Sequence, residues 1–448
     1  MMKRISFFLI ALVALAACQD DDAFTTSKGA LLTFDGDTLK MDTVFSRTAS
    51  STYTFWVHND NSDGIRLQNV RLARRNQTGF RVNVDGVYLD NSNGSQVNDL
   101  ELRGKDSLLV FVELTPAETQ QLEPQTLEDR LIFTLESGAE QSVLLQAWAW
   151  DAERIGTLTV TGDTVIESAK PLVVMEKIQV AEGARLTLRH TTLFFHDGAG
   201  MEVGGTLVME DCTLRGDRLD RMFSYLPYDR VSGQWGGVRF LESSVDNILT
   251  GTEIRNATAA IVCDSASIDT LRPRLTMEGC IVHNAEGTGI EAVNTYLILR
   301  KCQLTNTLGH CLAVYGGIAE VSRCTLAQFY PFSADRGAAL YFSNGWSGSP
   351  LPLLRLTCDD SILTGYEDDV VTGVPIDTLT AFNYRFANSL LRTPKVETAD
   401  SVYFSGIFWE TPKDSIQGKQ HFKVIDEDNL YYDFSLDSLS TVQGLGCY

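Results

Sequence analysis

The stretch RGDRLDRMFSYLPYDRVSGQWGG at residues 215–237 holds the densest set of side chains that could do chemistry. It combines carboxylates, guanidiniums and aromatic rings, which recognise sugars by hydrogen bonding to hydroxyls and by stacking on ring faces. We predict a glycan-binding site whose candidate residues are Asp217, Arg218, Asp220, Tyr228, Asp229, Arg230 and Trp235. The alternative is a structural loop, in which Asp and Arg side chains pair with each other and the aromatic rings serve as packing.

A second polar and aromatic stretch lies at residues 330–346. It carries Tyr330, Phe332, Asp335, Arg336 and Trp346. The same two interpretations apply to it, and Trp346 joins the ligand-binding candidates.

Motifs of well-known chemistries do not occur in this sequence. None of the six histidines stands in an H-E-x-x-H spacing, and no cysteine pair has the C-x-x-C spacing of a metal site. The sequence also lacks a P-loop, a dinucleotide fingerprint and a G-x-S-x-G motif. We therefore assign no catalytic residue, and we predict no metal ligand and no cofactor, with calcium kept open because loops could supply its ligands. The net charge of −21 excludes the basic footprint of a nucleic-acid-binding protein.

Repeated phrases reveal the elements that must position these loops. The phrases LTMEGCIV, LILRKCQL and AEVSRCTL place Cys280, Cys302 and Cys324 in one slot, and 302 − 280 and 324 − 302 both give 22 residues. Weaker copies of the phrase fill the slot with Thr191, Cys212, Thr252, Ser361 and Ser389. A fixed period of this size predicts a solenoid. Exchange of Cys with Thr and Ser favours a small buried filler over a disulfide, although an exported chain could form one.

A second phrase in each repeat alternates apolar residues with the period of a strand. It reads AIVC at 260, GIEA at 289, CLAV at 311 and ALYF at 339. Asn256, Asn284 and Asn306 recur between the two phrases, where stacked amides would hydrogen-bond along the solenoid axis. About two short strands per repeat, with no helical stretch, predict a parallel β-helix. Its outward strand positions do not stack carboxylates on adjacent coils, which argues against a calcium-dependent lyase cleft on these coils.

The N-terminus has the pattern of an export signal. Lys3 and Arg4 precede a short apolar run that ends in Leu15-Ala16-Ala17-Cys18. This sequence resembles a bacterial lipobox, which makes residues 1–17 a signal peptide and Cys18 the lipidated first residue of the mature chain. Residues 18–29 then form a tether, whose Gln19-Asp20-Asp21-Asp22 resembles a surface-export tag.

Residues 30–152 contain short alternating strands such as STYTFWVHND and SLLVFVEL, bounded by turn residues. Their number and spacing predict an immunoglobulin-like β-sandwich, with Trp56 and Trp148 as core anchors. Residues 153–448 form the β-helix, and the C-terminal segments SVYFSGIFW and IDEDNLYYDFSLDSLS are the natural cap for its open end.

The runs EGARLTLRHTTLFFHDGAGMEVGGTLVMEDC and IRNATAAIVCDS, together with DSLLVFVEL in the front domain, resemble the right-handed parallel β-helix lipoproteins of Bacteroidota. That resemblance covers nearly the whole chain and implies a fold like that of pectin lyases, but it implies no particular reaction. We expect a lipid-anchored, surface-exposed outer-membrane protein that binds or adheres to an extracellular glycan or another partner. The alternative is a polysaccharide lyase or glycoside hydrolase that works from a loop-lined cleft.

Overall fold

The chain folds into two compact units, Met1–Asp151 and Ala152–Tyr448. The computed structural model describes residues 23–221, 226–410 and 418–448. Cys18, the predicted lipidation site, lies outside the described residues. Strands dominate both units, and the short 3-10 helices are η1 Arg75–Gln77, η2 Asn91–Asn93, η3 Tyr228–Arg230, η4 Ala399–Tyr403 and η5 Lys419–His421. No helix in the described part of the chain is long and apolar enough to cross a membrane.

The N-terminal unit consists of two five-stranded sheets that share one hydrophobic core. The first sheet contains β1 Thr33–Phe34, β3 Tyr53–His58, β8 Ser107–Leu114, β5 Phe80–Val84 and β6 Val87–Tyr88. The second contains β2 Thr38–Phe45, β10 Glu140–Trp150, β9 Gln125–Leu135, β4 Ile65–Leu72 and β7 Gln96–Leu102.

The expectation that Trp56 anchors this core is wrong. Trp56 is 44% exposed, while its neighbours Phe55 and Val57 are buried. Side chains alternate between the two faces of a strand, so placing Phe55 and Val57 inside forces Trp56 outside. Trp148 is also only partly buried, because Ala147 and Ala149 take the inward positions of its strand.

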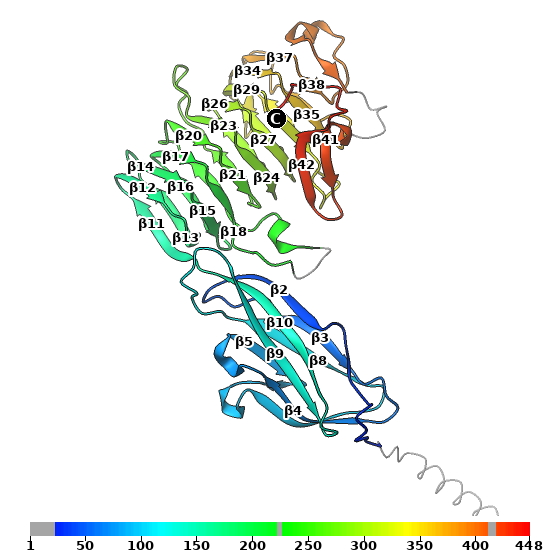
Figure 1. Ribbon diagram of the computed structural model, residues 1–448. Helices are drawn as coiled ribbons and strands as arrows, with labels where there is room; N and C mark the ends of the chain where they lie inside the picture. Colours follow the sequence, from blue (N-terminus) through cyan, green and yellow to red (C-terminus); the bar gives the residue numbers. More distant parts are fainter. Residues whose placement is uncertain (1–22, 222–225, 411–417) are drawn as a thin grey trace, which may run out of the picture. The chain divides into compact units, whose positions relative to one another are not determined.

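The C-terminal unit is a β-helix-like solenoid with three parallel faces (Figure 1). The long entry strands β11 Glu153–Val160 and β13 Leu172–Val180 serve both the second and the third face. The first face contains β12 Asp163–Glu167, β14 Arg185–Arg189, β17 Thr206–Glu210, β20 Asn247–Thr250, β23 Leu275–Glu278, β26 Tyr296–Arg300, β29 Gly317–Ser322, β34 Leu353–Asp359, β37 Phe382–Ala387 and β39 Phe404–Ser405. The second face contains β15 Thr192–Phe195, β18 Thr213–Gly216, β21 Glu253–Arg255, β24 Ile281–Ala285, β27 Gln303–Thr307, β30 Thr325–Gln328, β35 Ile362–Gly365, β38 Leu390–Leu391 and β40 Phe408–Trp409. The third face contains β16 Gly200–Val203, β19 Val238–Phe240, β22 Ile261–Cys263, β25 Ile290–Val293, β28 Leu312–Tyr315, β31 Leu340–Ser343 and β36 Val371–Val374.

A full coil therefore has three strands, whereas the sequence predicted about two. The repeated phrase is bent in the middle, because the residue before each slot position has a left-handed backbone conformation. Gly279 (φ 62°), Lys301 (φ 50°) and Arg323 (φ 51°) show it in successive coils. Only Gly adopts this conformation without a steric penalty, so the two charged residues gave no local sign of the bend. The phrase thus supplies one strand to the first face and one to the second.

The slot residues form a buried ladder with one recurring hydrogen bond. All eight are at most 2% exposed, which agrees with their predicted role as core fillers. Each also donates its hydroxyl or thiol to the backbone carbonyl two residues earlier, as in Cys302 to Arg300 (3.2 Å) and Ser361 to Asp359 (2.8 Å). The full set of donors is Thr191, Cys212, Thr252, Cys280, Cys302, Cys324, Ser361 and Ser389. The described cysteines are free thiols.

The recurring asparagines lie at the next bend, again in the left-handed region. Asn284 Nδ2 donates to Asn256 Oδ1 at 2.9 Å, which is the predicted amide contact along the axis. Asn306 breaks the series, because its Oδ1 accepts instead from the backbone N–H of Phe329 at 3.2 Å.

The C-terminal hairpin does not close the end of the solenoid. Its strands β41 Phe422–Asp426 and β42 Tyr431–Leu436 lie beside the second face (Figure 1). There Phe422 and Phe434 share a hydrophobic cluster with Phe329. The last rung is instead β39 with β40, from the segment SVYFSGIFW. The prediction that this hairpin caps the open end is therefore wrong. The hairpin packs on the side of the solenoid instead, because outward apolar side chains on the second face give it a surface to pack against.

Candidate functional site

A cleft of about 430 Å³ lies over the outer surface of the second face. Its walls are the described residues of the loop at 215–237 (215–221 and 226–237), the stretch after β30 and the C-terminal hairpin. We call it the arginine cleft, and it is lined by Arg215, Arg221, Asp229, Arg230, Glu253, Arg255, Asn256, Ile281, His283, Asn284, Gln303, Pro331, Phe332, Leu430, Tyr431, Tyr432, Asp433, Phe434 and Tyr448.

The floor of the cleft is a row of outward side chains on neighbouring rungs. Arg255 on β21 pairs with His283 on β24, which pairs with Thr305 on β27. Arg215 on β18 follows Leu214, whose partner Ile254 precedes Arg255, so Arg215 occupies the next rung of the same row. Adjacent rungs are about 4.8 Å apart. Parallel pairing therefore brings together two guanidiniums and an imidazole that are far apart in the sequence.

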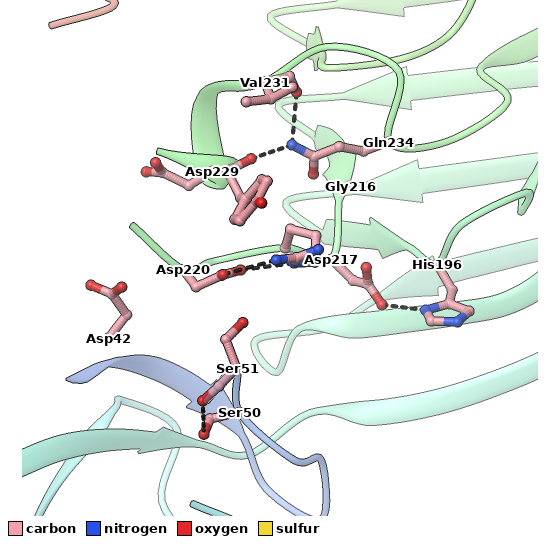
Figure 2. Close-up of polar contacts among 12 residues, drawn as sticks. Asp42, Ser50, Ser51, His196, Gly216, Asp217, Asp220, Asp229, Val231 and Gln234 are labelled. Atoms are coloured by element: carbon pink, nitrogen blue, oxygen red, sulfur yellow. Dashed lines mark hydrogen bonds and ion pairs between the residues drawn. The ribbon is translucent and has the colours of Figure 1, made fainter. Parts of the chain in front are cut away.

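The loop wall is held down by the asparagine ladder. Asn256 Nδ2 donates to the carbonyl of Asp229 at 2.8 Å, and Asn284 Nδ2 donates to the carbonyl of Arg230 at 2.7 Å. Inside the loop, Gln234 Nε2 donates to the carbonyls of Tyr228 and Val231 (Figure 2). The ladder therefore serves both the solenoid and the loop.

The hairpin wall supplies aromatic rings. Arg230 Nη1 donates to the carbonyl of Asn429 at 2.6 Å, which joins the loop to the hairpin across the cleft. Tyr431 is 53% exposed and lies 6.0 Å from the Arg230 guanidinium. Tyr432 packs beside His283, with ring centroids 5.5 Å apart. The cleft thus combines an exposed aromatic ring with buried polar groups.

Of the eight ligand-binding candidates, Asp229 and Arg230 line the cleft. Three others form a separate cluster on the loop. Arg218 makes a two-fold ion pair with Asp220 (2.8 and 2.9 Å), and its guanidinium lies 4.2 Å from the centre of the Tyr228 ring. These contacts match the structural alternative that the sequence left open.

Asp217 and Trp346 also lie away from the cleft lining. Asp217 Oδ2 pairs with His196 Nδ1 at 2.7 Å, between neighbouring coils of the solenoid (Figure 2). Trp346 in the short hairpin β32 Gly345–Trp346 and β33 Ser349–Pro350 packs on Tyr315, at 4.3 Å between ring centroids.

Trp235 is removed from the ligand-binding candidates. It is 1% exposed and stacks on Phe195 inside the solenoid, with centroids 4.2 Å apart. Its indole N–H donates to the carbonyl of Arg255 at 2.9 Å. The parallel bridge to Ala257 places Trp235 in line with the solenoid strands, so its side chain turns into the core and cannot stack on a sugar.

The electrostatics of the floor depend on the two adjacent guanidiniums. Burial, and then the charge of Arg255, lowers the pKa of Arg215 to about 10. Burial, and then the same neighbouring charge, lowers the pKa of His283 to about 3. His283 is therefore neutral at pH 7, and its Nδ1 lies 2.8 Å from Thr305 Oγ1.

Three buried polar atoms in the cleft have no hydrogen-bond partner within the described chain. They are Arg255 Nε, Asp229 Oδ1 and the Tyr432 hydroxyl. Buried polar groups are usually paired, and leaving one unpaired costs about 1–3 kcal/mol. The Asp229 side chain is only 10% exposed. The cleft thus presents a donor, an acceptor and a hydroxyl that would gain from a hydrogen-bonding ligand.

Sequence reasoning missed Arg255, His283 and the aromatic residues of the hairpin. The sequence did not predict Arg255 and His283 as site residues, because the repeated phrase gave no sign that the second face is a separate strand layer. Counting outward positions on both sides of each slot would have found them, since Arg255 and His283 both stand three residues after a slot position. The hairpin residues gave no local signal, because β42 meets the cleft through contacts with residues about 150 positions earlier.

No group of three or more His, Cys, Asp or Glu side chains in the described ranges is arranged to hold a metal ion. We therefore assign no calcium ligands among the described residues.

Comparisons with known proteins find similarity among solved structures alone. No protein-family model matches the sequence, and no curated protein matches it. The Agl-KA catalytic domain is 12% identical over 81% of this chain and 74% of that one, with a TM-score of 0.27. The catalytic domain of a GH87 alpha-1,3-glucanase is 9% identical over 81% of this chain and 91% of that one, with a TM-score of 0.20.

A family 123 glycoside hydrolase from Clostridium perfringens is 8% identical, with a TM-score of 0.18. The match covers 27% of this chain, which spans about a quarter (26%) of that enzyme's length. Because all these TM-scores are far below 0.5, the similarities carry no weight in assigning a function.

Proposed function

We propose that this protein binds an extracellular glycan in the arginine cleft without cleaving it. The observation that carries the proposal is the set of unpartnered buried atoms, Arg255 Nε, Asp229 Oδ1 and the Tyr432 hydroxyl. Sugar hydroxyls donate and accept hydrogen bonds, so one ligand of this class could satisfy all three. The exposed ring of Tyr431 adds an apolar surface for a sugar ring.

Binding is favoured over hydrolysis or lyase chemistry because the cleft carboxylates are already engaged. Asp229 pairs with Arg221 at 2.7 Å, and Glu253 pairs with Arg255 at 3.3 Å. Hydrogen bonds from the hydroxyl and backbone N–H of Ser435 lower the pKa of Asp433, although burial opposes the shift. A general acid needs a carboxyl that stays protonated near neutral pH, and the contacts of Asp433 favour its ionised form instead.

The test is a glycan array on the full mature protein, followed by calorimetry with any glycan that binds. Tyr431→Ala should weaken binding at least tenfold while the melting temperature stays within about 2 °C of wild type, because the ring is mostly exposed. Tyr403→Ala is the matched control, since Tyr403 is similarly exposed (42%) but belongs to the last coil.

Two results would overturn the proposal. Release of reducing or unsaturated ends from a bound glycan would favour the alternative, a lyase or glycosidase. Unchanged affinity in Tyr431→Ala would move the binding site away from the cleft.

We also propose that the protein is a lipid-anchored outer-membrane protein exposed at the cell surface, and that its N-terminal unit is immunoglobulin-like. The lipobox-like sequence before Cys18 and the two-sheet organisation of residues 30–152 support these proposals. Cys18→Ser should move the protein from the membrane fraction to the soluble fraction. A variant that fractionates like wild type would refute the lipid anchor.

A further inference from the structure

The floor of the arginine cleft places like charges side by side. Arg215 and Arg255 are outward residues on adjacent rungs of the second face, next to His283. Like charges directly opposite each other on neighbouring strands destabilise a sheet. An arrangement of this kind is retained at little cost only where something negative lies between or beside the two cations.

The protein's own groups compensate this charge incompletely. Arg215 donates to the carbonyls of Gly216, Arg218 and Asp229, all of which are neutral acceptors. Arg255 has Glu253 as its carboxylate partner, but Arg255 Nε remains unbonded within the described chain. The floor therefore holds two guanidiniums and one carboxylate that contacts them directly.

The other residues that line the cleft do not reverse the excess of positive charge on its floor. Arg230 donates to the carbonyls of Asn429 and Leu430 and also interacts with the charge of Asp426. Asp229 pairs with Arg221, and its charge also acts on Arg215. The lining contains four arginines and three carboxylates, Asp229, Glu253 and Asp433. A cationic floor stands out in a chain of net charge −21.

The titration of the floor agrees with this geometry. Burial and then the charge of Arg255 lower the pKa of Arg215 to about 10, against the opposing charges of Asp229 and Glu253, so the site on balance disfavours the cation it contains. An anion placed against both guanidiniums would reverse that penalty.

We infer that the arginine cleft selects glycans carrying a negatively charged group, a carboxylate or a sulfate, which binds between Arg215 and Arg255. This inference rests on the proposed glycan binding. Guanidiniums match both oxyanions through paired N–H donors, and Arg255 Nε supplies one such donor. Tyr431 and the Tyr432 hydroxyl are left for the neutral part of the sugar.

The experiment is calorimetric titration of the full mature protein with paired oligosaccharides that differ in charge alone. A hexamer of galacturonic acid is compared with its methyl ester, which tests for a carboxylate. Chondroitin sulfate oligosaccharides are compared with unsulfated chondroitin, which tests for a sulfate. A neutral maltohexaose tests for glycan binding that needs no charge.

We expect the charged member of at least one pair to bind at least tenfold more tightly than its partner, with an affinity that falls as salt is raised. Arg255→Gln should remove that preference, and Arg255→Lys should restore part of it because the charge returns without the fork of donors. Arg215→Lys gives a second test that keeps the charge at the more buried position. Arg385→Gln is the control, because Arg385 is an exposed arginine paired with Asp359 elsewhere on the solenoid.

The outcomes separate this inference from the proposed function. Equal binding of charged and neutral partners, or of maltohexaose alone, overturns the anion selectivity and leaves glycan binding standing. A charge preference that survives Arg255→Gln places the anion elsewhere and also overturns the inference. Failure of all these probes to bind, together with an empty glycan array, overturns both.

Discussion

In the slot ladder, every side chain donates a hydrogen bond to the same kind of partner, the backbone carbonyl two residues earlier. In the described part of the loop at 215–237, each contact has a different kind of partner. Cys302 and Ser361 repeat one hydrogen bond in different coils. Arg230 instead reaches Asn429, 199 residues away, and Asp229 is held by an asparagine of the next coil. The ladder obtains its order from repetition, and the loop obtains it from long-range contacts.

The difference between the ladder and the loop shows which part of such a fold can bind a ligand. The slot positions donate to the backbone of their own coil, so they leave no donor for a ligand. A loop on the same scaffold can leave atoms such as Asp229 Oδ1 unpaired, because the solenoid beneath it provides the stability. The loop contacts need not all be optimal for the fold to persist.

The largest effect is expected at Trp235, where the loop enters the core. Trp235→Ala should destabilise the solenoid by roughly 3–5 kcal/mol, because it removes a fully buried ring and its stacking partner for Phe195. Thermal unfolding of the solenoid measures the loss, and Trp56→Ala in the N-terminal unit is the control because Trp56 is 44% exposed. A nearly unchanged melting temperature would mean that Trp235 is not the junction of loop and core.

A smaller effect is expected in the ladder. Cys302→Phe should cost roughly 1–3 kcal/mol by overpacking the core, whereas Cys302→Ser should cost less than about 1 kcal/mol because its hydroxyl can still donate to the carbonyl of Arg300. Cys302→Ala should fall between these variants, since it fits the slot but loses the donor. The three melting temperatures give the order, and equal stability of Ser and Ala would show that the recurring hydrogen bond contributes nothing.

Native thiol labelling completes this test. Burial raises the pKa of Cys263 and Cys311 to about 12. The contact with Cys302 and burial raise the pKa of Cys280. The contact with Cys280 lowers the pKa of Cys302, but the contact with Cys324 and burial together raise it. These thiols should react with alkylating reagents only after unfolding, because the thiolate is the reactive form. Rapid modification of Cys280 or Cys302 in the folded protein would contradict the ladder.

The last effect is expected from pH at the cleft floor. The folded-state pKa of His283, about 3, lies below its ordinary value of 6.5, so in this interval the unfolded chain binds a proton that the folded chain excludes. The contribution of His283 is therefore fully present above about pH 6.5 and is lost as pH falls toward 3. His283→Gln should unfold with a smaller difference in denaturant midpoint between pH 7 and pH 4.5 than wild type. An identical difference would show that the surroundings of His283 do not exclude its proton.

The sequence by itself determined the all-β solenoid, because a structural repeat leaves a repeat in the chain. The 22-residue spacing of Cys280, Cys302 and Cys324 required stacked coils, and the interchange of Cys, Ser and Thr required a small buried side chain. The contact between Asn256 and Asn284 followed from the same repetition. These features are local in the sense that each coil meets only its neighbours.

Tertiary structure decided the third strand of each coil, the direction of Trp235 and the position of the C-terminal hairpin. The bend before each slot depends on a backbone conformation that Lys301 and Arg323 adopt only because the coils on either side fix it. The arginine cleft depends on the hairpin lying beside the second face, where Phe434 packs on Phe329, a contact spanning about 100 residues. Such contacts leave no period in the sequence, since each forms once, between segments that are far apart in the chain.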